Sequence, residues 1–248
     1  MVTFAIDPRK SAVVAIDLQN CNVEKSPIAA PLGLQVVDKL NLLAAHYRAA
    51  GSTIIWTRHA VRPDHSDVGI LGETVPPVAQ GVIDDGAPSA ALHPKVVVQA
   101  GDIILAKPHI GSFQATELET ILRARGIDTV LIGGIATNFC CDTTAREAHA
   151  REFKVLFLSD GTATIDLRDT AGGTIPADQV QRLTLATLAF GFAEVLSVAE
   201  ACEKLPATRN PSDRLRSRGD RTPRSTAARP RPTCRPRQKL EDALDGRG

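Results

Sequence analysis

The chain has 248 residues, of which 43% are hydrophobic and 23% charged, while aromatic residues make up only 4%. This composition indicates a globular protein with a core of aliphatic side chains and excludes a chain too polar to fold. No apolar run approaches the roughly 20 residues of a transmembrane helix, and the N-terminus lacks the pattern of a signal peptide, so we expect a cytoplasmic protein with no membrane partner.

The formal net charge of +1 combines an acidic body with a basic tail, since residues 207–248 carry 12 of the 29 Lys and Arg but only 5 of the 28 Asp and Glu. We expect a folded domain at 1–205 and a disordered Pro- and Arg-rich tail at 206–248, because the tail has few apolar residues to bury. Arg clusters can pair with phosphates, but the tail has no aromatic residue for base stacking. A dispensable extension is therefore favoured over nucleic-acid binding. The five cysteines are an odd number without framework spacing, which favours a reducing compartment.

The sequence of the first half of the chain predicts two strands separated by a helix. Residues 11–17 form a short β-branched run that ends on Asp17, and residues 31–50 carry apolar side chains at helical spacing until Gly51. A second strand is expected at 52–57. Residues 58–100 are rich in Pro, Gly, Asp and His and show no strong periodicity, although they could hold a short helix or strand. A segment of this length without regular structure is usually functional, for example as a lid over a substrate.

The second half predicts a regular alternation of strands and helices. Pro176 is expected at the first position of the last long helix, where its fixed φ is tolerated. Strands are expected at 101–106, 129–132, 154–159 and 194–198, and helices at 115–125, 139–151, 176–190 and up to Leu205. This order predicts a Rossmann-like, three-layer α/β/α sandwich around a mostly parallel sheet of about six strands.

A cysteine pair lies where the fourth strand meets the next helix, in the stretch Gly133-Gly134-Ile135-Ala136-Thr137-Asn138-Phe139-Cys140-Cys141. A helix N-terminus offers unpaired N–H groups and a positive dipole, which favour both a thiolate and an oxyanion. A buried structural cysteine is the alternative for such a residue considered alone.

Three reactive side chains follow three different strands. Asp17, Lys107 and Cys140 are all expected at the carboxyl edge of the sheet, where ligands bind in such folds. Asp17 can accept the thiol proton, Lys107 can stabilise the thiolate, and backbone N–H groups of the turn from Ala136 to Cys140 can bind the oxyanion of an attacked carbonyl. Considered singly, Asp17 could instead form a helix cap or a salt bridge, and Lys107 could be a solvated surface lysine. Their shared position favours catalysis by a cysteine nucleophile.

Three motifs carry a resemblance to the isochorismatase-like cysteine hydrolases, which include nicotinamidase, N-carbamoylsarcosine and ureidoacrylate amidohydrolases and biuret hydrolase. They are Ala15-Ile16-Asp17-Leu18-Gln19-Asn20, Lys107-Pro108-His109-Ile110-Gly111-Ser112-Phe113 and Gly134-Ile135-Ala136-Thr137-Asn138-Phe139-Cys140. The resemblance implies Asp17 as the base, Lys107 as the cation and Cys140 as the nucleophile. It also implies a cis peptide bond between Ile135 and Ala136, with the amides of Ala136 and Cys140 as the oxyanion hole. Cys141 is expected to pack beneath the helix.

The resemblance implies an amidohydrolase that cleaves a small amide, ureido or carbamoyl compound through a thioester and releases ammonia or an amine. Isochorismate-cleaving members lack the nucleophilic cysteine, so their reaction is disfavoured. A nicotinamidase-type enzyme and a non-catalytic binding or scaffold protein on the same fold are the alternatives. A homo-oligomer is expected, as is common for such domains.

No cofactor or metal is expected, because the stretch after the second strand lacks the Asp-x-His pair with which nicotinamidases bind a metal. His59, His65 and His93 are expected to be solvated loop residues rather than zinc ligands. Arg58, Arg62 and His109 could hold a substrate carboxylate, or they could equally be exposed loop charges. The residues expected to contact the substrate are Asn20, Trp56, Arg58, His109, Phe113 and Asn138.

Overall fold

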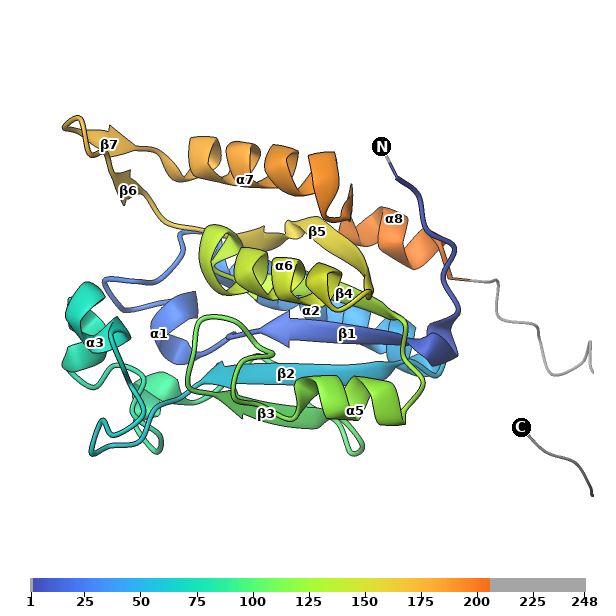
Figure 1. Ribbon diagram of the computed structural model, residues 1–248, viewed down its shortest axis with the longest axis horizontal. Coiled ribbons are helices and arrows are strands. Elements are labelled where there is room, and N and C mark those ends of the chain that lie inside the picture. The colour runs from blue at the N-terminus through green and yellow to red at the C-terminus, as the bar shows by residue number, and fades with distance from the viewer. Residues whose placement is uncertain (1, 206–248) are drawn as a thin grey trace, which may run out of the picture. The chain divides into compact units, whose positions relative to one another are not determined.

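The computed structural model describes residues 2–205, and the predicted tail at 206–248 lies outside this range. A single parallel sheet of six strands forms its centre, in the order β3-β2-β1-β4-β5-β8 (Figure 1). The strands are β1 (Ser11–Ile16), β2 (Thr53–His59), β3 (Ile103–Lys107), β4 (Thr129–Ile135), β5 (Lys154–Ala163) and β8 (Glu194–Leu196). This arrangement confirms the predicted α/β fold with a parallel sheet.

Helices cover both faces of the sheet because side chains alternate between them along each strand. On one face Val13, Ala15 and Trp56 pack against α2 (Gly33–Ala49) and α8 (Val198–Glu203). On the other face Val14 and Ile55 pack beneath three helices. These are α5 (Leu118–Ala124), α6 (Asp142–Ala150) and α7 (Ala177–Gly191). Every residue of β1 is buried, as expected of a central strand with neighbours on both sides.

Short elements complete the described part of the chain. They are η1 (Pro8–Lys10), α1 (Asn20–Val23), α3 (Leu71–Thr74), α4 (Pro76–Ala79), η2 (Pro88–Ala90), η3 (Thr137–Cys141), and the antiparallel pair β6 (Leu167–Arg168) and β7 (Thr174–Ile175). The arrows of β1, β2 and β3 point toward α1 and α3 in Figure 1. The carboxyl ends of these strands therefore lie beside the short helices of the segment from 58 to 100. Among residues 2–205, no helix has the length and apolar character needed to cross a membrane.

Several predicted boundaries differ from the observed ones. Strand β2 runs on to His59, and β5 runs on to Ala163, four residues past the predicted end. Pro176 caps α7 with an extended backbone instead of occupying the first helical position. The β6–β7 hairpin was not predicted, because two-residue strands are too short for a periodicity signal.

The order of the strands sets the position of the site. From β1 the sheet continues through β2 to β3 on one side, and on the other side through β4 to β5 and β8. The order in which strands are added to the sheet thus reverses between β1 and β4. This switch point creates a crevice beyond the carboxyl ends of the two strands. Ile16 lies beside Gly134 in the register of these two strands. Asp17 and the turn after β4 are therefore neighbours.

Candidate active site

Asp17 follows β1 directly and is fully buried. Its φ of 52° lies in the left-handed region, an uncommon conformation that Asp tolerates better than most residues. The Thr57 hydroxyl donates to Asp17 Oδ1 at 2.6 Å and accepts a bond from the Asp17 backbone N–H at 3.1 Å. Thr57, on β2, therefore fixes the direction of the carboxylate.

Lys107 is the last residue of β3 and is also fully buried. Its ammonium lies 2.9 Å from Asp17 Oδ2 and donates to the carbonyls of His109 and Ile110, each at 2.9 Å. It also donates to Cys140 Sγ at 3.4 Å. Burial alone would lower the pKa of Lys107, but the nearby Asp17 carboxylate and Cys140 raise it above its usual value. The site therefore holds a permanent cation.

The two oxygens of Asp17 differ in their contacts. Burial is the largest single influence and opposes ionisation of this carboxyl, but the Lys107 charge and the other polar neighbours, including the Thr57 hydroxyl, together outweigh burial and lower the pKa of Asp17. The contact between the ammonium and Oδ2 is ionic and lacks hydrogen-bond geometry, so within the described residues Oδ2 has no hydrogen-bond donor. An ionised, buried carboxylate oxygen without a donor is well suited to accept a proton.

Cys140 lies in η3, a π-type turn between β4 and α6. The Ile135–Ala136 peptide bond that precedes this turn is cis. Cys140 is 8% exposed, and burial raises the pKa of its thiol to about 12 despite the Lys107 charge. Its neighbour Cys141 is completely buried in the core beneath α6. Only the first thiol of the pair faces a cavity.

Gly134 allows the turn to approach Asp17. Its φ is 132°, and a Cβ at this position would overlap the backbone of Ile16 on β1. A residue with any side chain would push the end of β4 away from β1. Gly134 is therefore required by the close contact of the two strands that carry the carboxylate and the thiol.

His59 at the end of β2 joins Asp17, Lys107 and Cys140 as a fourth polar group of this cluster. A carboxylate oxygen of Asp17, a ring nitrogen of His59 and Cys140 Sγ all lie within 4.8 Å of one another. The ring Nε2 lies 3.3 Å from the Pro108 carbonyl, which can only accept, so Nε2 carries the proton and Nδ1 is free to accept. Burial, followed by the Lys107 charge, lowers the pKa of His59 to about 4. The imidazole is neutral at pH 7.

The side chain of Gln19 fixes the backbone of His59. Gln19 Oε1 accepts from the His59 N–H at 2.8 Å, and Gln19 Nε2 donates to the carbonyls of His59 and Ala90 at 2.9 and 2.7 Å. The buried amide thus joins the chain after β1, the end of β2 and the segment that precedes β3.

The expectation of solvated histidines is wrong for two of the three residues. His59 and His93 are 7% and 4% exposed. The His93 ring lies 3.2 Å from Glu24, and His65 is half-buried against Asp84 at 2.9 Å. The three histidines do not gather around one point, because each has a separate partner.

Carboxylate, imidazole and thiol are possible metal ligands, and Asp17, His59 and Cys140 are close enough to share one cation. The Lys107 ammonium, however, already lies 2.9 Å from the carboxylate and 3.4 Å from the sulfur. A metal ion would have to bind against this charge or displace it. The residues therefore fit an acid–ammonium–thiol cluster better than a metal centre.

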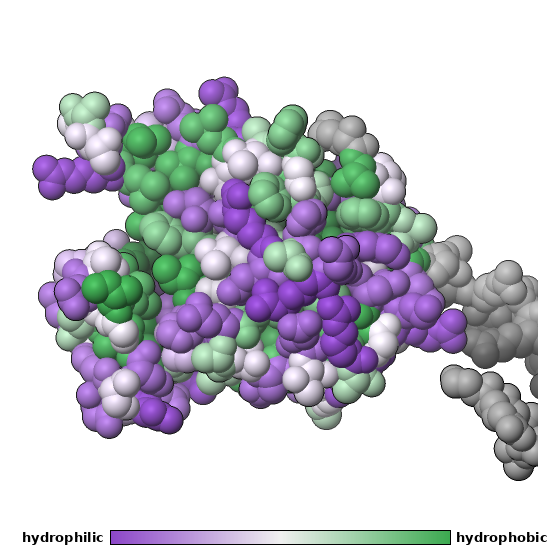
Figure 2. Space-filling view, in the orientation of Figure 1, coloured by the Kyte–Doolittle hydropathy of each residue, from purple (hydrophilic) through white to green (hydrophobic). Residues whose placement is uncertain are grey.

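A cavity of about 160 Å³ opens onto Cys140. It is lined by Asn22, Ile28, His59, Leu71, Val75, Val78, Ile83, Ile110, Ile135, Ala136, Phe139, Cys140 and Ile165. In the space-filling view the surface is hollowed between the β6–β7 hairpin and α3, and hydrophobic residues gather beside α3 (Figure 2). A larger groove of about 660 Å³ lies between α2, β5 and α7, but Asp17, Lys107 and Cys140 do not line it.

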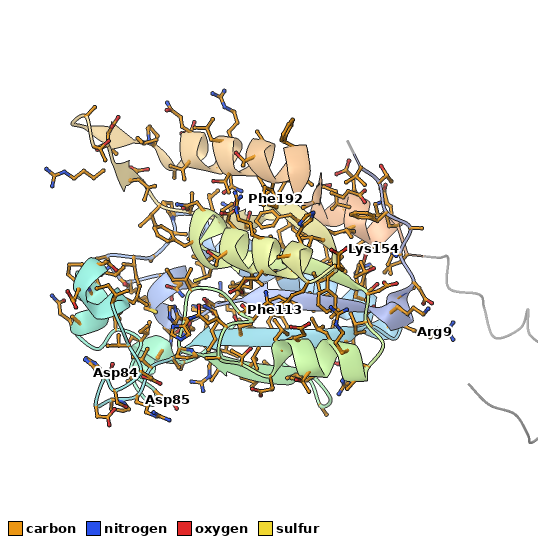
Figure 3. All side chains as sticks on the ribbon, in the orientation of Figure 1. Arg9, Asp84, Asp85, Phe113, Lys154 and Phe192 are labelled. Atoms are coloured by element: carbon orange, nitrogen blue, oxygen red, sulfur yellow. The ribbon has the colours of Figure 1, made fainter. Side chains whose placement is uncertain are left out.

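None of the six residues expected to contact substrate lines this cavity. Trp56 is fully buried against α2, with its indole N–H bonded to Asp102, so its expected role in binding is corrected to packing. Phe113 is buried against Phe153, on the face of the sheet that carries α5 (Figure 3).

Four further candidates are also absent from the cavity wall. Asn20 donates to the Pro88 carbonyl at 2.8 Å, and Arg58 pairs with Asp85 at 3.1 Å. The Asn138 side chain accepts from Thr164, and His109 contributes its carbonyl to Lys107. Of the expected oxyanion residues, Ala136 and Cys140 do line the cavity.

Three residues of the site were not found from the sequence. Thr57 and His59 lie two positions apart on β2, between the strands that carry Asp17 and Lys107, so the alternation of side chains could have placed both at the site. Asn22, whose Nδ2 donates to the Asp17 carbonyl at 2.9 Å, lies in a short helix with no clear sequence signal.

The doubly covered parallel sheet and the acid–ammonium–thiol cluster at its switch point define the isochorismatase-like cysteine hydrolase class. Residues 11–200 match the isochorismatase domain family, and the chain belongs to that family. It is 30% identical to the ureidoacrylate amidohydrolase RutB of Methylorubrum extorquens over an alignment of 178 residues that covers 64% of this chain and 72% of the relative. It is 31% identical to nicotinamidase 3 of Arabidopsis thaliana over 197 residues, 79% of this chain and 86% of the relative. A solved cysteine hydrolase from Pseudomonas syringae pv. phaseolicola has a TM-score of 0.79 and 35% identity, covering 82% of this chain and 96% of the other.

Proposed function

We propose that this protein is an amidohydrolase that cleaves the C–N bond of a small amide, ureido or carbamoyl compound through a thioester on Cys140. The observation that carries the proposal is the buried cluster in which Lys107 lies 2.9 Å from Asp17 Oδ2 and 3.4 Å from Cys140 Sγ. The names of two relatives, a ureidoacrylate amidohydrolase and a nicotinamidase, agree in describing enzymes that act on amide nitrogen.

In the proposed first half-reaction the Cys140 proton moves to Asp17 Oδ2 as the sulfur attacks the substrate carbonyl. The C–S bond forms, and the carbonyl oxygen becomes an oxyanion next to the turn from Ala136 to Cys140. Backbone N–H groups of this turn supply the donors for that charge. Asp17 then gives its proton to the departing nitrogen, the C–N bond breaks, and ammonia or an amine leaves.

In the second half-reaction Asp17 takes a proton from water, which attacks the thioester carbonyl. The C–S bond breaks, the acid product leaves, and the proton returns to the Cys140 sulfur. Lys107 remains charged throughout and lies close enough to both partners to stabilise whichever one carries the negative charge.

The test is ammonia release from a panel of small amides and ureides, with mass spectrometry of the intact protein to detect an acyl adduct. Cys140→Ala is expected to abolish both turnover and the adduct, because no other thiol or hydroxyl side chain among residues 2–205 lines the cavity. The matched control Cys141→Ala, one residue away and fully buried, is expected to keep most of the activity. Turnover that survived in Cys140→Ala would refute the assignment of the nucleophile.

A further inference from the structure

The wall of the catalytic cavity is apolar on nearly every side. Nine of its thirteen lining residues are Ile, Leu, Val or Phe: Ile28, Leu71, Val75, Val78, Ile83, Ile110, Ile135, Phe139 and Ile165. The α3–α4 segment supplies three of these, and it is held by a small core in which Val78 and Ile83 pack with Cys21 and Val61. The apolar wall is therefore a packed part of the fold.

The cavity offers a charged substrate no partner. No Lys or Arg within residues 2–205 lines it, and its imidazole, His59, is neutral. Lys107 lies just behind Cys140, but its ammonium is engaged by the Asp17 carboxylate, the carbonyls of His109 and Ile110, and Cys140 Sγ. A carboxylate that entered the cavity would lose its water shell without gaining an ion pair, which is strongly unfavourable.

The basic residues near the strand ends do not supply a positive charge to the cavity. Arg58 projects from the opposite face of β2 from His59 and pairs with Asp85, which lies in the segment after α4 (Figure 3). Arg62 is exposed and is absent from the cavity wall. The alternative in which these residues hold a substrate carboxylate is therefore not supported by their positions.

The volume limits the size of the apolar group. An apolar protein cavity of about 150 Å³ holds one benzene molecule, and the catalytic cavity has about 160 Å³. The space next to Cys140 thus fits a short branched alkyl chain or one six-membered ring, together with the amide that reaches the thiol.

We propose that the enzyme acts on small, uncharged carboxamides that carry a compact apolar group, and that it discriminates against amides and ureides that carry a carboxylate. This rests on the proposed amidohydrolase function. Hydrolysis converts the neutral amide and water into ammonia and a carboxylic acid, which ionises near neutral pH. The same wall that accepts the substrate then disfavours the product, so product release is assisted by the charge that the reaction creates.

The decisive comparison uses two amides of similar shape, 4-methylpentanamide and succinamate, in which an isopropyl group replaces a carboxylate. We expect kcat/KM for the neutral amide to exceed that for succinamate by at least about 100-fold, because the cavity pairs no anion. Equal or better turnover of succinamate would overturn the neutral-substrate proposal and leave the amidohydrolase function intact. Failure of every amide to release ammonia or acylate Cys140 would overturn both.

Alkylation of Cys140 tests the cavity without any hydrolysis. The rates of modification by iodoacetamide and by iodoacetate are measured by peptide mass spectrometry, with glutathione in the same tube as the reference thiol. We expect the preference for the neutral reagent at Cys140 to exceed that of glutathione by at least about 10-fold. A ratio equal to that of glutathione would contradict the inferred selectivity whatever reaction the protein catalyses.

A single charge inserted into the wall should reverse this preference. Val75 lines the cavity and is only half-buried, so Val75→Arg can place its stem along the wall without disrupting the core. We expect the variant to gain activity toward succinamate and reactivity toward iodoacetate, and to lose activity toward 4-methylpentanamide. The control Thr74→Arg adds the same charge at the adjacent exposed position outside the cavity, and should leave both ratios unchanged. Equal responses of the two variants would refute the role of the wall.

Discussion

Replacing Lys107 with methionine removes the buried cation and keeps a side chain of similar length in its place. The Lys107 and Asp17 side chains both have no exposed surface, and their charged atoms lie 2.9 Å apart. In the variant the Asp17 carboxylate stays buried with no positive charge beside it. Breaking a buried ion pair by removing one partner typically costs about 3–5 kcal/mol. We expect a loss of that size in the free energy of unfolding near pH 7.

The pH dependence of stability should change sign in this variant. In the wild type the pKa of Asp17 is lowered, so its stabilising contribution is present above the ordinary pKa of Asp and is lost as the pH falls through the lowered value. The pKa of Lys107 is raised, so its contribution is lost only as the pH rises past the ordinary range of Lys. Without Lys107, the main influence that offsets burial is lost, and burial raises the pKa of Asp17. The free energy of unfolding of Lys107→Met should therefore increase as the pH is lowered from about 8 to about 5.

Urea unfolding at a series of pH values measures both effects. The double variant Asp17→Asn with Lys107→Met removes both charges, and we expect it to recover at least about 2 kcal/mol relative to Lys107→Met. The control Lys154→Met breaks the half-exposed pair with Asp128 at the start of β5 (Figure 3) and should cost less than about 1 kcal/mol. A loss in Lys107→Met no larger than in the control, with the same pH slope as the wild type, would refute the energetic role of the buried pair.

Two further variants test how the carboxylate and the turn are held. Thr57→Val removes a hydrogen-bond donor to Asp17 and should raise the pKa of this carboxyl. The acid limb of the kcat/KM profile should therefore move to higher pH by up to about one unit. An acid limb that did not move would contradict this role of the Thr57 hydroxyl. Gly134→Ala places a Cβ against the backbone of β1 at a φ of 132° and should cost about 1–3 kcal/mol in urea unfolding. Gly191→Ala, at an open position at the end of α7, should be neutral or stabilising by up to about 1 kcal/mol. Similar effects of the two glycine substitutions would show that the close approach of β4 to β1 is unimportant for folding.

The fold was predictable because its signals are local and regular. Runs such as 11–16 and 129–132 contain only residues that suit buried strands, and they alternate with helical patterns, which leaves few topologies other than a doubly covered parallel sheet. The rule that ligands bind at the carboxyl ends of the strands then placed Asp17, Lys107 and Cys140 on one edge. The structure brings these three residues within contact distance.

The contacts to substrate were not predictable for a different reason. Side chains such as Trp56 and Phe113 lie close in sequence to the strand ends, but which face of the sheet a residue occupies decides whether it meets the cavity or the core. Trp56 is turned toward α2, whereas Thr57, one position later, is turned toward Asp17. Four residues of the apolar wall come from 71–83, which lacks periodicity, and the other five come from distant segments that pack there.

A thiol with a pKa of about 12 can still act as the nucleophile, because its proton need not leave the site. At rest the buried cluster contains the Asp17 carboxylate, the Lys107 ammonium and the neutral Cys140 thiol. Transfer of one proton from Sγ to Oδ2, which has no hydrogen-bond donor among the described residues, gives a neutral carboxyl, the same ammonium and a thiolate. Both states have the same net charge, so the transfer brings no additional charge into the buried site. The elevated pKa describes loss of the proton to water, and it keeps the thiol protonated until a carbonyl is close enough to be attacked.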